Sequence, residues 1–127
     1  MEPQTGLHAQ VCRVLRTLKL PSNTEREMQD ALWSVLPGLL PSATVEREVR
    51  YGDRGRLDFL ISDDAEAIGI ECKVDQTGRS GVYRQVRRYA QEAGVTGLVV
   101  LAPWPGVSNF VVEEVPVTVV DWSRRTL

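Results

Sequence analysis

TVEREVRYGDRGRLDFLISDDAEAIGIECKV, residues 44–74, contains three strand patterns separated by short polar loops. Thr44–Arg50 alternates apolar and charged residues, as a half-buried strand does. Leu57–Ser62 and Ala67–Val74 are mostly apolar, which indicates strands that are buried more fully. Consecutive strands with short connections usually pair as an antiparallel meander. This stretch therefore predicts the first three strands of a sheet.

The residues before this meander predict two amphipathic helices. Apolar residues recur at helical spacing from Leu7 to Leu18, and we expect this first helix to end before Pro21. Residues 22–24 are all good N-cap residues, so the second helix is expected to begin there. The Pro37-Gly38 pair is expected to end it.

The residues after the meander predict one more helix and two more strands. Val82–Ala93 has a helical pattern that ends at Gly94. Leu98–Leu101 is continuously apolar, as in a strand buried on both faces, and Val115–Asp121 is the last strand. The order α-α-β-β-β-α-β-β predicts an α/β protein with a mixed sheet flanked by helices. We expect one domain over residues 1–127.

Composition excludes several classes of site. The chain has 127 residues, 43% hydrophobic and 25% charged, which is typical of one soluble globular domain. Cys12 and Cys72 are its only cysteines and His8 its only histidine, so a disulfide framework, a zinc finger and a histidine cluster are excluded. We expect Cys12 in the core and His8 at the surface, and we expect the tryptophans in the core. No apolar run of eighteen residues and no secretory signal is visible, so a cytoplasmic location without membrane contact is expected.

The charge distribution predicts a local basic surface within an acidic total. One basic group, which is interleaved with Glu48 and Asp53, consists of Arg47, Arg50, Arg54 and Arg56. The net charge is −2 and the pI is about 5.4, which argues against bulk coating of nucleic acid. The segment from Gln76 to Gln91 nevertheless contains no acid and four arginines: Arg79, Arg84, Arg87 and Arg88. These arginines can hold a phosphate backbone, although an ordinary solvated helix face has the same pattern.

Three charged residues lie where the strands should be most apolar. They are Asp58, Glu71 and Lys73. Burying an unpaired charge is costly, and folding alone gives no reason to place charges there. Alternation puts Glu71 and Lys73 on one face, and a hairpin brings Asp58 beside Glu71. Two adjacent carboxylates repel each other unless a cation lies between them, and oxygen ligands favour Mg²⁺ or Mn²⁺.

Lys73 is unusual for this chain. The sequence has 13 arginines but only two lysines, Lys19 and Lys73. A lysine two residues from an acid in a buried strand suggests a need for a compact ammonium group rather than a general positive charge. Two simpler interpretations stay open. Asp58 can be a buried acid that pairs with Arg56 or Lys73, and Glu71 and Lys73 can be an exposed ion pair.

Several of these residues together resemble a known family. Gly55-Arg-Leu-Asp58, followed thirteen residues later by Glu71-Cys-Lys73, resembles the PD-(D/E)XK nuclease superfamily. Gln85-Val-Arg-Arg-Tyr89 is similar to the Gln-x-x-x-Tyr motif of its RecB-like members. Thr24-Glu-Arg-Glu-Met28 is similar to the first helix of archaeal Holliday-junction resolvases. The resemblance covers about residues 24–102 and implies a restriction-endonuclease-like core.

The resemblance also implies a metal site. Asp58 would be the central ligand, Glu71 the second, and the carbonyl of Cys72 a third. Lys73 would orient or activate the attacking water. Glu25 would complete the shell around Mg²⁺ or Mn²⁺. Its neighbour Glu27 stays an alternative, because both residues also have the spacing of capping glutamates.

The helix that follows the meander has supporting roles in this resemblance. Gln85 would position Lys73 or the phosphate, and Tyr89 would support it, although the two can also be ordinary helix residues. The chain departs from the family at Leu57, where a proline commonly precedes the aspartate.

The implied function is metal-dependent hydrolysis of DNA phosphodiester bonds, with branched or damaged DNA among the expected substrates. A site of this size cuts one strand, so two cuts need a homodimer, which we expect. The alternative is a catalytically inactive nuclease fold that acts as a nucleic-acid-binding or regulatory module. The sequence does not decide whether the substrate is DNA or RNA, or whether the enzyme is an endonuclease or an exonuclease.

Overall fold

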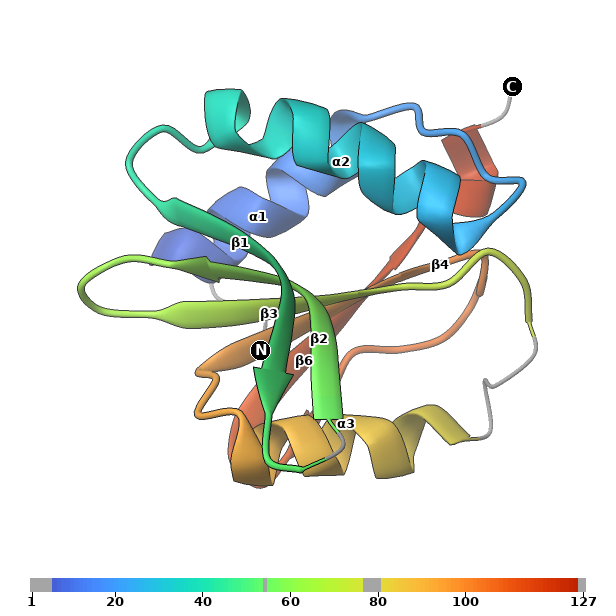
Figure 1. Ribbon diagram of the computed structural model, residues 1–127. Helices are drawn as coiled ribbons and strands as arrows, with labels where there is room; N and C mark the ends of the chain where they lie inside the picture. The colour runs from blue at the N-terminus through green and yellow to red at the C-terminus, as the bar shows by residue number, and fades with distance from the viewer. Residues whose placement is uncertain (1–5, 54, 77–80, 126–127) are drawn as a thin grey trace.

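The computed structural model describes residues 6–53, 55–76 and 81–125, and it contains three α-helices and six strands (Figure 1). The elements are α1 Gly6–Thr17, α2 Glu25–Leu39, β1 Thr44–Tyr51, β2 Gly55–Ser62, β3 Ala67–Cys72, α3 Val82–Glu92, β4 Gly97–Ala102, β5 Phe110–Val112 and β6 Val115–Asp121, with a short 3₁₀ helix, η2, at Trp122–Arg125. No helix in these described ranges is long and apolar enough to cross a membrane.

The strands form one mixed sheet in the order β1-β2-β3-β4-β6-β5. The predicted antiparallel meander is confirmed: β1 pairs with β2, and β2 with β3. β3, β4 and β6 are parallel, with α3 as the connection between β3 and β4. The sequence did not predict β5, which pairs antiparallel with β6 at the edge of the sheet.

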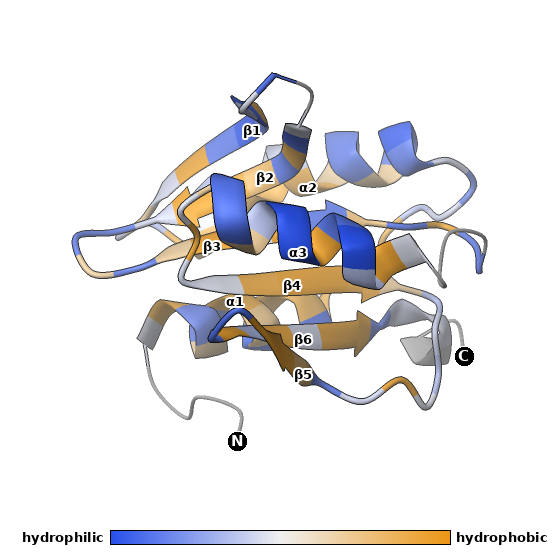
Figure 2. Cartoon of the chain, turned by 90° about the horizontal axis from the view of Figure 1, so that it is seen from below, coloured by the Kyte–Doolittle hydropathy of each residue, from blue (hydrophilic) through white to orange (hydrophobic). Residues whose placement is uncertain are grey.

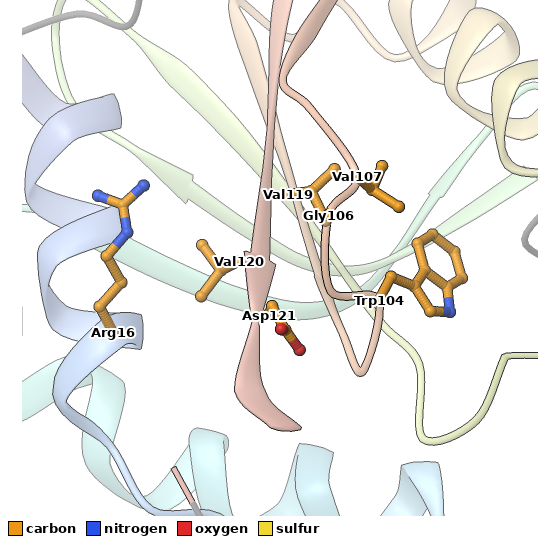
Figure 3. Close-up of a pocket in the computed structure, with 7 residues that line it drawn as sticks. All are labelled: Arg16, Trp104, Gly106, Val107, Val119, Val120 and Asp121. Atoms are coloured by element: carbon orange, nitrogen blue, oxygen red, sulfur yellow. The ribbon is translucent and has the colours of Figure 1, made fainter. Parts of the chain in front are cut away.

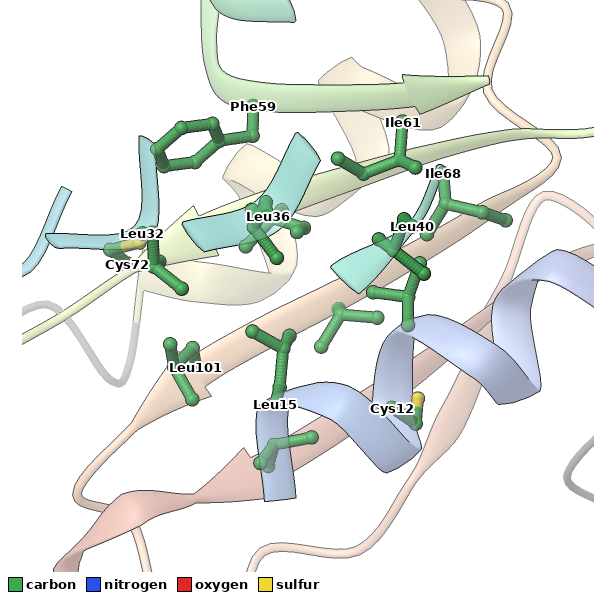
Figure 4. Close-up of a cluster of buried hydrophobic side chains, with 14 of the residues drawn as sticks. Cys12, Leu15, Leu32, Leu36, Leu40, Phe59, Ile61, Ile68, Cys72 and Leu101 are labelled. Carbon is green, nitrogen blue, oxygen red and sulfur yellow. The ribbon is translucent and has the colours of Figure 1, made fainter. Parts of the chain in front are cut away.

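Helices cover both faces of the sheet. α1 and α2 lie on one face and α3 lies on the other (Figures 1 and 2). The first face buries a large cluster that includes Leu15, Leu36, Phe59 and Cys72 (Figure 4). Burying apolar area of this kind contributes about 25 cal/mol per Å² to folding.

The other face is covered by a single helix. Val82, Val86 and Tyr89 recur at helical spacing on α3 and are buried against the apolar strand β4. The outward face of α3 is hydrophilic, and the strands beneath it are apolar (Figure 2). Helix α3 therefore packs on the sheet through one apolar stripe, and the side chains outside this stripe are not needed for that packing.

The first hairpin bends sharply halfway along its length, and this bend affects the candidate site. Glu48 on β1 has a φ of +56°, a left-handed conformation that costs a non-glycine residue about 1 kcal/mol. On β2, Leu57 and Phe59 pack into clusters on opposite faces of the sheet, so the alternation breaks at Asp58 between them. The outer half of the hairpin consequently turns away from α2 and runs toward α3 (Figure 1).

The second helix is longer than the sequence predicted. It passes through Pro37 and ends at Leu39. Proline removes only the hydrogen bond to the carbonyl of Trp33, four residues earlier. Trp33 is 43% exposed, so water can satisfy that carbonyl, whereas the sequence interpretation placed this tryptophan in the core.

The surface prediction for His8 is wrong. Its side chain is 1% exposed, and Nε2 lies 2.9 Å from the hydroxyl of Thr118. Gly97 makes room for the ring, because a Cβ atom at that position would collide with Nδ1. Cys12 is buried as predicted.

Candidate active site

The candidate site lies where β2 and β3 separate. Their ladder runs from Ser62 paired with Ala67 to Phe59 paired with Ile70 and then stops. The next residue of β2 is Asp58, whose side chain replaces the ladder: its Oδ2 accepts the backbone N–H of Cys72 at 2.7 Å. This hydrogen bond holds the carboxylate between the strands, next to Glu71.

Glu71 is held by three donors from two elements. Its Oε1 accepts the hydroxyl of Tyr89 at 2.8 Å. Its Oε2 accepts Nε2 of Gln85 at 3.1 Å and lies 3.2 Å from Nζ of Lys73. Helix α3 therefore supplies two of the groups that fix this carboxylate. The sequence predicted the two α3 residues for the site but assigned them to Lys73 or the phosphate, and in the structure both contact Glu71.

The two carboxylates are buried, and their negative charges repel each other. Asp58 is 7% exposed and Glu71 is 6% exposed. Burial and, after it, the nearby charge of Glu71 together raise the pKa of Asp58 to about 7, against the hydrogen bond from Cys72. Burial also raises the pKa of Glu71, while Lys73 opposes that rise. Such a pair attracts a cation.

Lys73 lies on the face that alternation predicted. Its ammonium group pairs with Glu71, whereas Ile70 and Cys72 pack into the core on the other side. Its backbone N–H donates to the carbonyl of Leu101 at 2.8 Å, and its carbonyl accepts the indole N–H of Trp122 at 2.9 Å. Sequence reasoning did not assign Trp122 this role, because nothing local in the sequence links η2 to β3.

The alternative in which Asp58 forms an ordinary ion pair is not what the structure shows. Among the described residues, Asp58 forms no salt bridge, and its short contact is the backbone N–H of Cys72. The exposed-pair alternative also fails, because Glu71 is buried and only Lys73 reaches toward solvent.

Between the two glutamates of α2, the structure favours Glu25. Thr24 is the N-cap, and its hydroxyl accepts the N–H of Glu27 at 3.1 Å. The charge of Glu25 raises the pKa of Asp58, of Glu71 and of the Cys72 thiol, so this carboxylate is near enough to act on the site electrostatically. Glu25 is nevertheless exposed.

The predicted arginines lie on the outer surface. Arg84, Arg87 and Arg88 are exposed on α3, the helix that also carries Gln85 and Tyr89. Arg79 lies outside the described residues. A positive surface therefore borders the carboxylate pair.

The donor set fits a hard divalent cation in chemistry and only partly in geometry. Two buried carboxylates on adjacent strands are ligands of the type that Mg²⁺ and Mn²⁺ prefer. Within the described ranges, however, no three His, Cys, Asp or Glu side chains converge closely enough to form a ready metal site. Glu25 contributes charge at its present distance, and it would have to move inward to become a ligand.

A hollow lies elsewhere on the molecule. Its volume is about 390 Å³, and Arg16, Trp104 and Asp121 are among the residues that line it (Figure 3). None of the residues that the sequence analysis proposed for catalysis lines this hollow. Asp58 and Glu71 lie instead where β2 and β3 separate, and both are buried.

Comparison of the chain with protein-family models, with curated proteins and with solved structures found no significant match.

Proposed function

We propose that this chain is a metal-dependent nuclease that hydrolyses phosphodiester bonds in DNA through a PD-(D/E)XK-type site. The observation that carries the proposal is the pair of buried carboxylates, Asp58 and Glu71, with the ammonium group of Lys73 at 3.2 Å from Glu71. The element order and the sheet that surround them are compatible with a restriction-endonuclease-like core.

Three groups of the chain would hold the ion. Asp58 and Glu71 provide carboxylate oxygens, and Cys72 provides a carbonyl. The N–H and the carbonyl of one residue in an extended strand point to the same side, so the Cys72 carbonyl is directed like the N–H that binds Asp58. A bound Mg²⁺ or Mn²⁺ would lower the pKa of a coordinated water molecule and would neutralise negative charge on the phosphate oxygens.

The other residues have roles that follow from their contacts. Lys73 serves as a cation that orients the attacking water and stabilises charge on the phosphate. The water oxygen bonds to phosphorus, the bond from phosphorus to the 3′ oxygen breaks, and that oxygen takes up a proton. Gln85 and Tyr89 hold Glu71 in position, so that the two carboxylates stay aligned without the ion.

Cleavage by matched variants tests the proposal. The substrates are a supercoiled plasmid and a four-way junction, each with Mg²⁺, with Mn²⁺ and with EDTA. We expect Asp58→Asn and Lys73→Met to reduce the cleavage rate by roughly 10²-fold or more. Lys19→Met and Asp64→Asn are the controls, because both residues are exposed and Asp64 lies in the turn at the other end of the β2–β3 ladder from Asp58. Equal cutting by all variants, or cutting in EDTA, would reject the proposal.

The alternative is a module that binds nucleic acid without cutting it. One observation favours it: Glu25 does not complete a three-ligand cluster in the described structure. In that case DNA binds, neither substrate is cut with either ion, and divalent ions do not raise the melting temperature.

A further inference from the structure

The tip of the first hairpin presents two arginines side by side. Arg50 on β1 pairs directly with Arg56 on β2. Directly opposite residues share one face of a sheet, with Cβ atoms about 4.5–5.5 Å apart, and like charges in this position destabilise the pairing. Both side chains are exposed, and within the described residues neither forms a salt bridge. Folding alone therefore gives no reason to place two arginines opposite each other here.

The hairpin tip is fixed in place rather than free in solution. The bend at Glu48 and Asp58 directs it toward α3. There the ring of Tyr51 meets the edge of Tyr89, with ring centroids 5.3 Å apart. The hydroxyl of Tyr89 also lies 3.4 Å from the carbonyl of Arg56. The residue that binds Glu71 thus also holds the arginine pair.

The arginine pair lies close to the candidate site. Arg56 is two residues from Asp58 along β2, a distance of about 7 Å between Cα atoms. A guanidinium on this strand is long enough to reach a phosphate one or two nucleotides from the reacting one. Arginine also binds phosphate oxygens through two parallel N–H groups, which lysine cannot do.

Acids near the tip reduce its charge, and among the residues that the structure describes none of them pairs with the two arginines. Glu48 and Asp53 are exposed on the same hairpin, and the carboxylate of Glu92 lies against Gly52. The exposed Arg88 of α3 lies near Tyr51 on the other side. The positive potential is therefore local, which suits contact with single phosphates better than bulk attraction of polyanions.

We propose that Arg50 and Arg56 form a phosphate clamp that grips the DNA backbone beside the bond to be cut. The inference rests on the proposed function and gives a specific substrate contact to two arginines of the basic group around the first hairpin. The clamp requires no particular base, because phosphate contacts position the protein without reading sequence.

DNA binding as a function of salt tests the clamp separately from catalysis. The double variant Arg50→Gln/Arg56→Gln is compared with the wild type by fluorescence anisotropy on a labelled duplex, with Ca²⁺ in place of Mg²⁺. The control is Arg13→Gln/Arg16→Gln, which removes the same charge from the exposed surface of α1. We expect the tip variant to lose roughly ten- to fiftyfold in affinity at 0.1 M salt, and its salt slope to fall by about two.

The outcomes separate the clamp from the nuclease proposal. A tip variant that binds like the control, while the wild type still cuts DNA, overturns the clamp and leaves the nuclease proposal intact. A wild-type protein that neither binds nor cuts DNA overturns both. The single variants Arg50→Gln and Arg56→Gln should melt no lower than the wild type, because each removes a like-charge contact. A clear fall in melting temperature for both would show that the pair is structural and overturn the clamp.

Discussion

Replacing Asp58 by asparagine should stabilise the protein in a way that depends on pH. The pKa of Asp58 in the fold is about 7, against an ordinary 3.8. The folded chain therefore binds this proton more tightly than the unfolded chain does between these two values. The contribution of this proton to the free energy of unfolding is fully present below about pH 4. It is lost as the pH rises toward 7, where the buried carboxylate becomes charged. Asparagine cannot ionise, and its carbonyl oxygen can still accept the N–H of Cys72.

The size of the effect follows from the shift. About three pKa units at 1.36 kcal/mol each correspond to on the order of 4 kcal/mol. The pKa of Glu71 is raised too, so this second buried carboxylate also destabilises the fold as it ionises. Asparagine at position 58 does not remove that part of the pH-dependent loss of stability. Part of the change occurs below pH 5, so we expect the stability difference between variant and wild type to grow by about 1 to 3 kcal/mol from pH 5 to pH 8.

Urea unfolding in EDTA at pH 5 and pH 8 measures this difference. Asp64→Asn is the matched control, because it makes the same change at an exposed position on the turn between β2 and β3. A difference that does not change with pH, or an Asp58→Asn variant that is less stable at both pH values, would refute the reasoning about burial and repulsion.

Two further predictions concern the support of the site and of the fold. Tyr89→Phe removes the hydroxyl that binds Glu71 at 2.8 Å, so we expect a loss of about 1 to 3 kcal/mol in denaturant unfolding and slower cleavage, whereas Tyr83→Phe at an exposed position should change neither. Gly97→Ala places a Cβ atom against the ring of His8 and should cost about 1 to 3 kcal/mol in the same assay, and a neutral effect would contradict the packing of α1 on β4.

The parts of the fold that follow from local rules could be predicted from the sequence. Alternation is a property of any extended strand, so the shared face of Glu71 and Lys73 and the opposite face of Cys72 followed directly. The meander and the order of its strands followed from the short loops, and the place of α3 followed from its apolar stripe.

The parts that depend on tertiary contacts could not be predicted. The bend at Glu48 carries no glycine or other signal of a left-handed residue. The turn between β5 and β6 consists of Glu113 and Glu114, with φ of +51° and +65°, where Asn-Gly would have indicated a hairpin. The burial of His8 depends on the space that Gly97 leaves on another element.

The burial of the two candidate carboxylates could be predicted from the sequence, but their partners could not. Burial of a charge is visible in the sequence as an acid inside an apolar strand, and this signal identified Asp58 and Glu71. Which partners those acids choose is not visible, because Gln85 and Tyr89 reach Glu71 from a helix fourteen or more residues away. The spacing of Glu25 from the inward-facing Met28 already favoured it over Glu27, and in the structure the charge of Glu25 acts on both buried carboxylates.

Calorimetric titration with Mn²⁺ at pH 7.5 tests the central claim most directly, namely that the carboxylates of Asp58 and Glu71 hold a divalent cation. The account predicts saturable binding to the wild type and to Asp64→Asn, release of protons on binding because the pKa of Asp58 is near 7, and no binding to Asp58→Asn at the same concentrations. A wild type that binds no Mn²⁺, or an Asp58→Asn variant that binds it as tightly as the wild type, would contradict the account.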